Sequence, residues 1–385
     1  MSRGLGRAVN KLSDRRPINL LNVMWSAGND YNSVHKVHAQ IVAHCGCVAF
    51  SESWLLMGRS LQAGAGGLQN VREWEFSKSI LKKRLWAKVI GFNKILKLKR
   101  ELNLDTWNVV LIDGPGVAAF LLPLIKDRPN LNIVVIFHSG YSLKSRQLKV
   151  LKGFLGKRKL KLAAVSESLA TAVSSGIGHP VSTLRISYDP QEVMQSSMSR
   201  PEARKRLGGL PRDAIVFGAV GRLVESKGFE LLIEAYAEAI ESLGNVYLVI
   251  IGEGALRPVL ERRIIDLGMS GKVLLPGYIS GATAFYSAFN WTLIPSRNEG
   301  LGLVLQESLL ARVPVVVSDL PVFREQLGDA GIYVPLGGKS GWVKFFQNCA
   351  SKDASSVFEK QFSALSPYDR WAKYKEDCNL LISEI

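Results

Sequence analysis

The chain has 385 residues, of which 47% are hydrophobic, with 35 Gly and 15 Pro. This length exceeds one ordinary core and predicts two domains of under about 200 residues each. The hydrophobic content excludes a disordered chain, because disordered chains have too few apolar side chains to fold. The longest apolar run after the first strand, 117–125, is well short of the roughly 20 residues that cross a bilayer. We therefore expect a globular protein without a spanning helix.

The net charge of +16 is concentrated in the first half of the chain. Residues 1–190 contain 28 Lys/Arg and 11 Asp/Glu, whereas residues 191–385 contain 21 and 22. An excess of this kind predicts an anionic partner for the first half, either a membrane surface or a nucleic acid. Four cysteines without CxxC or zinc-binding spacing indicate reduced thiols, and the basic, polar start shows no secretory signal.

The first half follows a strand–turn–helix pattern. Residues 18–25 predict a strand, followed by a loop at Gly28 and a helix near 33–44. Short β-branched runs at 107–112, 132–137 and 162–165 predict further strands, and the long segments between them favour a parallel sheet. A charged, proline-punctuated stretch at 188–211 then separates the two halves.

The second half alternates strands and helices more regularly. The predicted strands are 215–220, 246–251, 273–275, 291–294 and 313–317, and the predicted helices are 229–243, 256–267, 282–288 and 303–311. This density of alternation predicts two doubly wound α/β domains. In such domains ligands bind at the carboxyl ends of the strands, so a cleft between the two domains is the expected site.

The segment 295–307 carries the strongest functional signal. A strand ends at Ile294, a polar turn follows, and a helix begins near Gly302. Glycines at 300 and 302 allow backbone N–H groups close to a ligand, and a helix start favours anions. Glu299 and Glu307 are then roughly 8–12 Å apart, which suits a pyrophosphate with a sugar on either side. The alternative is an ordinary helix start capped by Asn298.

A second segment, 220–228, also joins a strand to a helix. Its cations, Arg222 and Lys227, project where a leaving nucleoside diphosphate would develop negative charge, and paired cations can stabilise that charge. Surface cations at a turn are the alternative interpretation.

Several motifs in the second half carry a resemblance to a known family. They are Gly221-Arg222-Leu223, Lys227-Gly228, Gly252-Glu253-Gly254 with Leu256-Arg257, Leu275-Pro276-Gly277-Tyr278, and Glu299 with Glu307, separated by seven residues. In this order and spacing they resemble the family 4 retaining glycosyltransferases of the GT-B fold, which are of the group 1 type. The resemblance is close over roughly residues 215–335.

The resemblance implies a nucleotide-sugar site in the second domain. Arg222 and Lys227 would contact the diphosphate, and Glu299 with Gly300, Leu301 and Gly302 would contact the donor sugar and phosphates. Glu307 would bind the ribose, and the base would lie near Tyr278 and Ile279. Gly221 and Gly254 complete the expected donor-binding set.

The first half resembles the family more weakly. Gly28 stands where the family has a pair of glycines, the second replaced here by Asn29. His138 is similar in position to the family histidine near the transferred sugar, which gives it an expected catalytic role beside Arg222, Lys227 and Glu299. Ser166 resembles the family's helix-capping serine. Ser187-Tyr188 replaces the family's Asn-Gly pair.

A competing motif opens at Asp113. The stretch 113–119 mimics the glycine-rich turn of dinucleotide-binding folds, but no acid follows near 134–136, where that site requires one. We therefore interpret it as a tight turn between strand and helix.

Two basic segments lie in the first domain. Residues 78–103 hold nine Lys/Arg and one acid around a broad apolar stripe, and residues 144–161 add eight cations. A basic amphipathic helix with Trp and Phe can lie in a membrane interface, and anionic lipids attract such clusters. An ordinary helix with a solvated basic face is the alternative. Nucleic acid is not expected, because no nucleic-acid-binding module or stacking platform is recognised.

We therefore predict a GT-B protein with two Rossmann-like domains facing across a cleft. The expected divisions are an acceptor domain at 1–195, a donor domain at 196–366 and a last helix at 367–385 that returns to the first domain. The expected reaction moves a sugar, with retention, from a nucleotide-diphosphate sugar to a lipid-linked or cell-surface glycan such as lipopolysaccharide. We expect no metal ion or other cofactor, and a cytoplasmic protein at the inner face of the membrane. The alternatives are a non-enzymatic membrane- or nucleic-acid-binding protein and a nucleotide-sugar epimerase.

Overall fold

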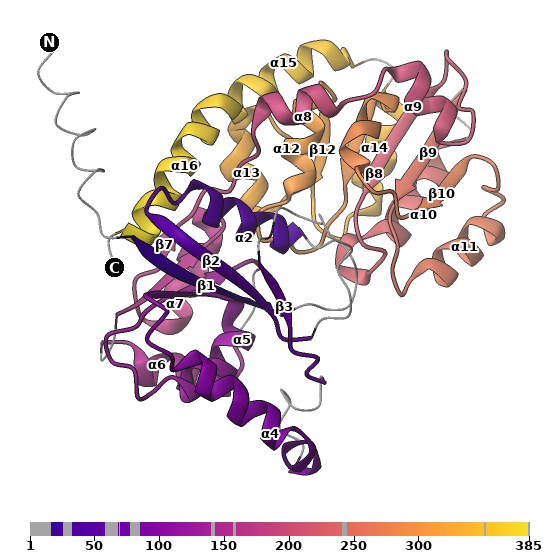
Figure 1. The fold of residues 1–385 in the computed structure, drawn as a ribbon. Helices are drawn as coiled ribbons and strands as arrows, with labels where there is room; N and C mark the ends of the chain where they lie inside the picture. The colour runs from indigo at the N-terminus through magenta and orange to yellow at the C-terminus, as the bar shows by residue number, and fades with distance from the viewer. Residues whose placement is uncertain are drawn as a thin grey trace, which may run out of the picture. The chain divides into compact units, whose positions relative to one another are not determined.

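The computed structural model describes residues 17–25, 33–57, 68, 70–77, 85–139, 143–156, 159–240, 245–349 and 352–383. Its contacts divide the chain into two compact units (Figure 1). Unit 1 comprises Met1–Ile186 and Lys373–Ile385, and unit 2 comprises Ser187–Ala372. The division after Ile186 lies before the boundary expected at 195, because Tyr188 and Val193 pack against Leu310 of unit 2.

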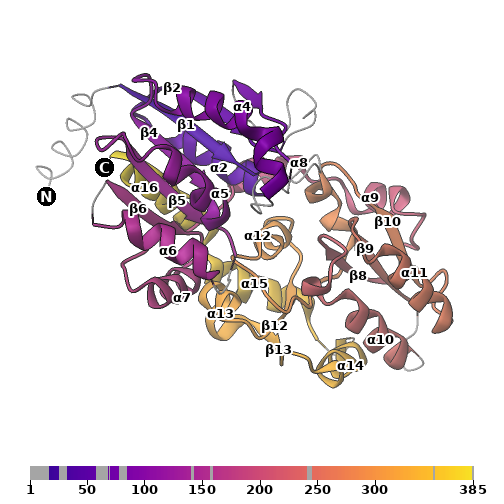
Figure 2. The ribbon, with the colours of Figure 1, turned by 90° about the horizontal axis from the view of Figure 1, so that it is seen from below.

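Unit 1 contains a seven-stranded parallel sheet in the order β3-β2-β1-β4-β5-β6-β7. Its strands are β1 Ile18–Met24, β2 Val48–Leu55, β3 Val71–Glu73, β4 Val109–Asp113, β5 Asn132–Phe137, β6 Leu160–Ala164 and β7 Ser182–Thr183. Its helices are α2 Ser33–His44, α4 Leu85–Leu102, α5 Gly114–Leu121, η2 Leu122–Leu124, α6 Ser145–Phe154 and α7 Glu167–Ile177. The sheet is seen in Figures 1 and 2 as the indigo-to-magenta part of the ribbon.

The local signals of unit 1 explain most of these elements. The central strands β1, β4 and β5 are almost wholly buried, so they form the continuous apolar runs of a sheet covered on both faces. Ser166 caps α7 as expected, accepting a hydrogen bond from the Leu169 backbone N–H at 3.3 Å. Strand β4 passes directly into α5 at Gly114, which is the tight turn expected for the motif at 113–119.

Unit 2 contains a six-stranded parallel sheet in the order β10-β9-β8-β11-β12-β13. Its strands are β8 Ile215–Val220, β9 Val246–Ile251, β10 Val273–Gly277, β11 Trp291–Ile294, β12 Val315–Ser318 and β13 Ile332–Val334. Its helices are α8 Pro190–Ser196, α9 Arg200–Arg206, η3 Glu225–Lys227, α10 Phe229–Ala239, α11 Arg257–Asp266, η5 Ala282–Ala288, α12 Leu303–Leu310, α13 Pro321–Leu327, η6 Gly328–Ala330, α14 Lys339–Asn348 and α15 Ala354–Leu365.

Both faces of the unit 2 sheet are covered. Alternate residues of β8 enter different apolar clusters, since Phe217 packs with α10 and α14, whereas Val216 packs with α9 and η5. Strand β9 alternates in the same way, with Leu248 in the first cluster and Val249 in the second. This two-sided burial explains why these strands are continuous apolar runs in the sequence.

The last helix, α16 Pro367–Ser383, contributes its second half to unit 1. The Cys378 carbonyl accepts a hydrogen bond from Cys45 Sγ at 3.1 Å, and Asn379 Oδ1 accepts one from the Gly46 N–H at 2.9 Å. Lys161 Nζ donates to the Leu380 carbonyl at 3.3 Å. These contacts attach residues 373–383 to the turn after α2 and to β6.

No helix within the described ranges combines the length and the apolar composition that a bilayer crossing demands.

A buried arginine fixes the start of unit 2 to its sheet. Arg204 is 2% exposed, and its guanidinium donates to five acceptors at 2.7–3.0 Å. Four are backbone carbonyls and the fifth is Asn290 Oδ1. The planar, multiply donating guanidinium suits this arrangement, and no other side chain reproduces its geometry.

We predict that Arg204→Lys destabilises unit 2 by about 2–4 kcal/mol, because buried carbonyls lose their donors. The matched control is Arg206→Lys on the same helix, where the arginine is exposed and pairs only with Glu202. We expect the control to change the free energy of unfolding by under about 0.5 kcal/mol. Urea unfolding followed by circular dichroism compares the two variants, and equal midpoints would contradict the prediction.

Candidate active site

The candidate site in unit 2 lies where the order of the strands reverses. Strands β8 and β11 are neighbours, with β9 and β10 on one side and β12 and β13 on the other. The loops that follow β8 and β11 therefore leave the same edge in opposite directions, and ligands of open α/β sheets bind at such a point. These two loops carry Arg222, Lys227 and Glu299, and Glu307 lies in α12, the helix that follows the second loop.

The two loops contact each other directly. The Arg297 N–H donates to the Ser226 carbonyl at 2.8 Å. Gly228 has φ +69°, and a Cβ at this position would overlap the carbonyl of Pro295. Only glycine combines this backbone conformation with this approach. The loops are thereby held side by side.

An ion pair joins the loops at the centre of the site. Lys227 Nζ contacts Glu299 Oε1, and the two side chains are only 19% and 12% exposed. Ser296 Oγ donates to the same carboxylate oxygen at 2.8 Å. The structure thus brings together two of the predicted catalytic residues and orients the carboxylate. The third, Arg222, lies exposed after β8, and the described residues show no ion pair or hydrogen bond of its guanidinium.

The second carboxylate, Glu307, is held by two tyrosines. Tyr188 Oη donates to Glu307 Oε1 at 2.6 Å, and Tyr286 Oη donates to Oε2 at 2.9 Å. Neither tyrosine was predicted as a site residue. The only sequence signal was the replacement of the family's Asn-Gly pair by Ser187-Tyr188, because residues 188 and 307 meet only through the fold.

The start of α12 carries the glycine-rich turn. Gly302 is the N-cap residue with φ +74°, so the alternative of a helix capped by Asn298 is wrong. Leu301 is buried, and its carbonyl accepts a hydrogen bond from Gln326 Nε2 at 2.7 Å. Gly300 is buried as well. Leu301 therefore does not present its side chain to a ligand.

The remaining predicted donor residues lie along the same sheet edge. Gly221 follows β8, Gly254 follows β9, and Tyr278 and Ile279 follow β10. The Leu223 backbone bridges the first two loops, because its N–H donates to the Glu253 carbonyl at 2.8 Å. Tyr278 is 53% exposed, whereas Ile279 packs against an apolar cluster of unit 2.

Unit 1 has its own group of polar side chains at the carboxyl ends of β4 and β5. His138, which follows β5, lies with Nε2 3.0 Å from His38 Nε2 and 3.6 Å from Asp113 Oδ1. His38 Nδ1 is 2.7 Å from Asn22 Oδ1. The sequence predicted His138 but missed His38 and Asp113, since no local spacing relates residues 38, 113 and 138. Gly28, predicted at this edge, lies outside the described residues.

Burial determines the charge of this group. It lowers the pKa of His138 to about 3 and raises the pKa of Asp113 to about 7. It also lowers the pKa of His38 well below the usual value, with a smaller contribution from His138. At neutral pH both imidazoles are neutral, so the approach of His138 to Asp113 is not an ion pair.

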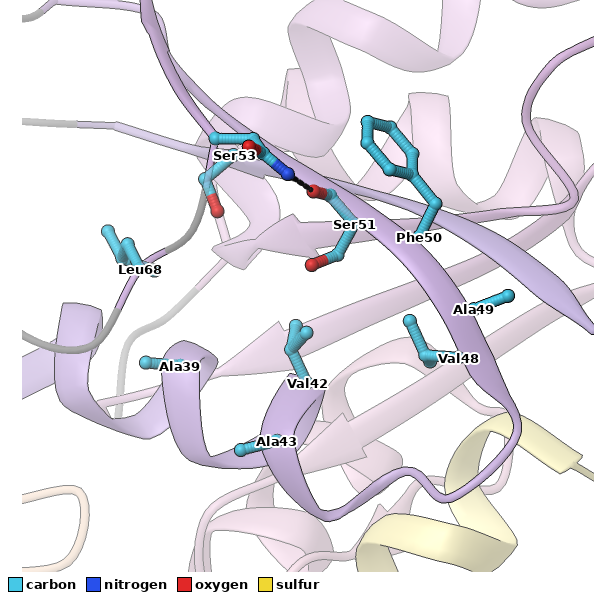
Figure 3. A pocket seen from close by; sticks show the side chains of 10 residues that line it. Ala39, Val42, Ala43, Val48, Ala49, Phe50, Ser51, Ser53 and Leu68 are labelled. Carbon is cyan, nitrogen blue, oxygen red and sulfur yellow. Dashed lines mark hydrogen bonds between the residues drawn. The ribbon is translucent and has the colours of Figure 1, made fainter.

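A small hollow lies next to this group, between α2 and β2 (Figure 3). Its volume is about 170 Å³, and apolar side chains of α2 and β2 form most of its lining. Ser53 lines the hollow and accepts a hydrogen bond from Asn22 Nδ2 at 3.2 Å. The lining contains none of the predicted donor residues.

The fold and the site together define a GT-B protein. Similarity to solved structures covers nearly the whole chain. Anabaena Alr3699/HepE, crystallised with UDP and glucose, has a TM-score of 0.76 and 15% identity over 96% of this chain and 100% of its own. WaaG, a glycosyltransferase involved in lipopolysaccharide biosynthesis, has a TM-score of 0.73 and 14% identity over 95% and 100%.

Sequence comparison finds a family match within unit 2. Residues 200–345 match the family model of the glycosyl transferases group 1. The lipopolysaccharide core biosynthesis glycosyltransferase LpsE of Rhizobium meliloti is 34% identical over 146 residues, which are 37% of this chain and 42% of LpsE. The chain thus matches under half the length of this relative. The predicted GT-B fold and the predicted resemblance to group 1 glycosyltransferases are confirmed.

We predict that Gly302→Ala destabilises unit 2 by at least about 2 kcal/mol, because an alanine is strained at this φ and its Cβ would overlap the Phe323 ring. Gly281→Ala is a matched control, since Gly281 has φ +69° with open space around its Cβ position. We expect about 1 kcal/mol from the backbone conformation alone. Thermal unfolding distinguishes the two variants, and an equal loss of stability would show that the contact with Phe323 is unimportant.

Proposed function

We propose that this protein transfers a sugar from a nucleotide-diphosphate sugar to a hydroxyl of a lipid-linked or cell-surface glycan of the lipopolysaccharide type. The donor binds at the carboxyl edge of the unit 2 sheet, and the acceptor binds to unit 1. The observation that carries this proposal is the Lys227–Glu299 pair at the point where the strand order reverses. Titratable groups of opposite charge, held in adjacent loops beside a glycine-rich helix start, suit a phosphorylated sugar.

The proposed chemistry assigns each group a binding role. Lys227 and Arg222 face the diphosphate and stabilise the negative charge that develops when the bond between the sugar and the phosphate breaks. Glu299 accepts hydrogen bonds from the sugar, and Glu307 accepts them from the ribose. His138, as a neutral imidazole, contributes a hydrogen bond to the transferred sugar.

We further propose that the sugar keeps its anomeric configuration. The acceptor oxygen forms its bond to the sugar on the face from which the diphosphate leaves, and the proton of the acceptor hydroxyl passes to the departing diphosphate. No enzyme nucleophile is required in this scheme. The two cations balance the diphosphate charge, so the proposed transfer proceeds without a metal ion at the diphosphate.

Three similar proteins support the choice of substrates. HepE was crystallised with UDP-glucose, which supports a nucleotide sugar as the donor. The name of LpsE places that protein in lipopolysaccharide core biosynthesis, and WaaG is likewise involved in lipopolysaccharide biosynthesis. A glycan of this type is therefore the acceptor that we propose.

We predict that Lys227→Ala and Glu299→Ala each lower turnover of the donor by at least about 100-fold, because each removes a group that binds the charged part of the transition state. Release of nucleoside diphosphate from a panel of sugar nucleotides measures turnover. The matched control is Arg263→Ala, which breaks the ion pair between Arg263 on α11 and Glu234 on α10. We expect this control to retain turnover.

The same assay separates the alternative functions. A non-enzymatic binding protein would release no diphosphate even as the wild type, and an epimerase would convert the sugar nucleotide without releasing it. Full turnover in both site variants, with the fold intact, would refute the proposed roles of Lys227 and Glu299.

We also propose that unit 1 meets an anionic membrane surface, at the inner face of the cytoplasmic membrane, through residues 78–103 and 144–161. Residues 78–84 lie outside the described residues, but α4 carries Phe92 and Leu96 one turn apart, 57% and 48% exposed. Exposed lysines lie beside them at 94 and 97, and α6 exposes Lys149 and Lys152. Exposed apolar side chains among cations support an interfacial helix.

We predict that replacing Phe92 and Leu96 together by serine weakens binding to anionic vesicles at least about tenfold, because two apolar side chains no longer insert. The matched control replaces Val259 and Ile265 of α11, which are 45% and 68% exposed, by serine. Vesicle co-sedimentation at fixed ionic strength measures the effect. Equal binding by the two double variants would refute the assignment to α4.

A further inference from the structure

Three side chains of unit 1 direct one ligand atom each towards a common point. They are His38 of α2, Asp113 at the end of β4 and His138 directly after β5. The Nε2 atoms of the two histidines and a carboxylate oxygen of Asp113 all lie within 4.8 Å of one another. His38 is fully buried, and the side chains of Asp113 and His138 are 16% and 12% exposed.

Hydrogen bonding within unit 1 fixes which nitrogen of His38 carries its proton. The oxygen of the Asn22 amide only accepts, so His38 Nδ1 must carry the hydrogen that joins them at 2.7 Å. A neutral His38 then presents a bare Nε2 to His138. A proton on His138 Nε2 can satisfy His38 but not Asp113, whose oxygen is 3.6 Å away.

A cation at the common point could contact all three groups at once. Metal ions bind neutral imidazole nitrogens and carboxylate oxygens at about 2.0–2.2 Å, so ligand atoms on one ion are at most roughly 4 Å apart. The separations of 3.0 and 3.6 Å around His138 meet this condition. Histidines that bind metals regularly donate a hydrogen bond from the ring nitrogen that does not bind the metal, and this bond fixes the orientation of the ring. For His38, the Asn22 side-chain oxygen is the acceptor of that bond.

We infer that His38, Asp113 and His138 form a binding site for one divalent transition-metal ion. Two nitrogens and one carboxylate oxygen suit Zn²⁺, with a fourth position left for water or a substrate oxygen. Binding forms two metal–nitrogen bonds and one metal–oxygen bond, and the proton on His138 Nε2 moves to Nδ1 of the same ring, so that both imidazoles stay neutral ligands. The ion binds only Nε2 of His138, and Nδ1 on the other side of the ring does not contact it.

The three ligand residues belong to unit 1, whereas the proposed diphosphate-binding residues belong to unit 2, and His138 is the residue shared with the proposed contact to the transferred sugar. Metal binding here is compatible with a transfer that needs no metal ion at the diphosphate. The test therefore measures metal binding rather than turnover of the donor.

The experiment titrates Co²⁺ into the full chain after removal of metals with EDTA and follows the visible absorption of the bound ion. We expect one equivalent to bind and to be displaced by Zn²⁺. His38→Gln and Asp113→Asn should each weaken binding at least about tenfold. His179→Gln is the control, because His179 belongs to unit 1 but not to this group, and it should leave binding unchanged.

A second measurement uses the wild type alone. It tests the inference even where a variant fails to fold. The chain has five histidines. Zn²⁺ should shift the ¹⁵N resonances of the ring nitrogens in two of them. Absence of Co²⁺ absorption in the wild type, equal binding by the site variants and the control, or unshifted histidine resonances would each overturn the inference.

Discussion

The ion pair between Lys227 and Glu299 is the interaction on which the account of unit 2 depends. It joins the loops after β8 and β11, which lie side by side because these strands are neighbours at the reversal of the strand order. Each loop would otherwise present an isolated charge at a half-buried edge, which is costly in free energy. Held together with Ser296, the two groups are fixed in orientation, and a ligand with an anionic diphosphate and a hydroxyl-rich sugar matches both.

The second carboxylate is organised differently, and this changes what it can do. Both oxygens of Glu307 already accept phenol hydrogen bonds, from Tyr188 and Tyr286. A carboxylate has about four lone-pair sites, so it can still accept from a ribose hydroxyl. Its fixed orientation favours binding over proton transfer. Two carboxylates in one site are often interpreted as a general acid and a general base. Here Glu299 pairs with a lysine and Glu307 is held by two tyrosines, so we assign both carboxylates to binding.

The sequence predicts most of unit 2 because its strands are buried on both faces. Strands 215–220, 246–251 and 291–294 have the predicted bounds, since continuous β-branched runs between glycine-rich turns leave little ambiguity. Strand β2 was missed because its middle, Ser51-Glu52-Ser53, is polar. Strands β3, β7 and β13 have only two or three residues, too few to establish a period.

Contacts between distant residues could not be predicted from the sequence. The motif residues Lys227 and Glu299 were identified, but their mutual pairing depends on the packing of two loops. Tyr286 lies in a short 3-10 helix and carries no motif, so only the fold reveals its bond to Glu307. His38, Asp113 and His138 likewise meet because α2 packs beside β1 and because β4 and β5 are adjacent. Sheet order, rather than local spacing, assembles each of these groups.

We propose that the nucleotide of the donor binds at the carboxyl edge of the unit 2 sheet, with its ribose on Glu307. The most direct test compares the affinities of a nucleoside diphosphate and of its 2′,3′-dideoxy analogue by calorimetric titration, after UDP, ADP and GDP are screened for the base that binds. We expect the dideoxy analogue to bind at least about tenfold more weakly to the wild type, because hydrogen bonds to a charged carboxylate are lost. We expect the difference to disappear in Glu307→Gln. Equal affinities in the wild type, or a difference that persists in the variant, would contradict the account.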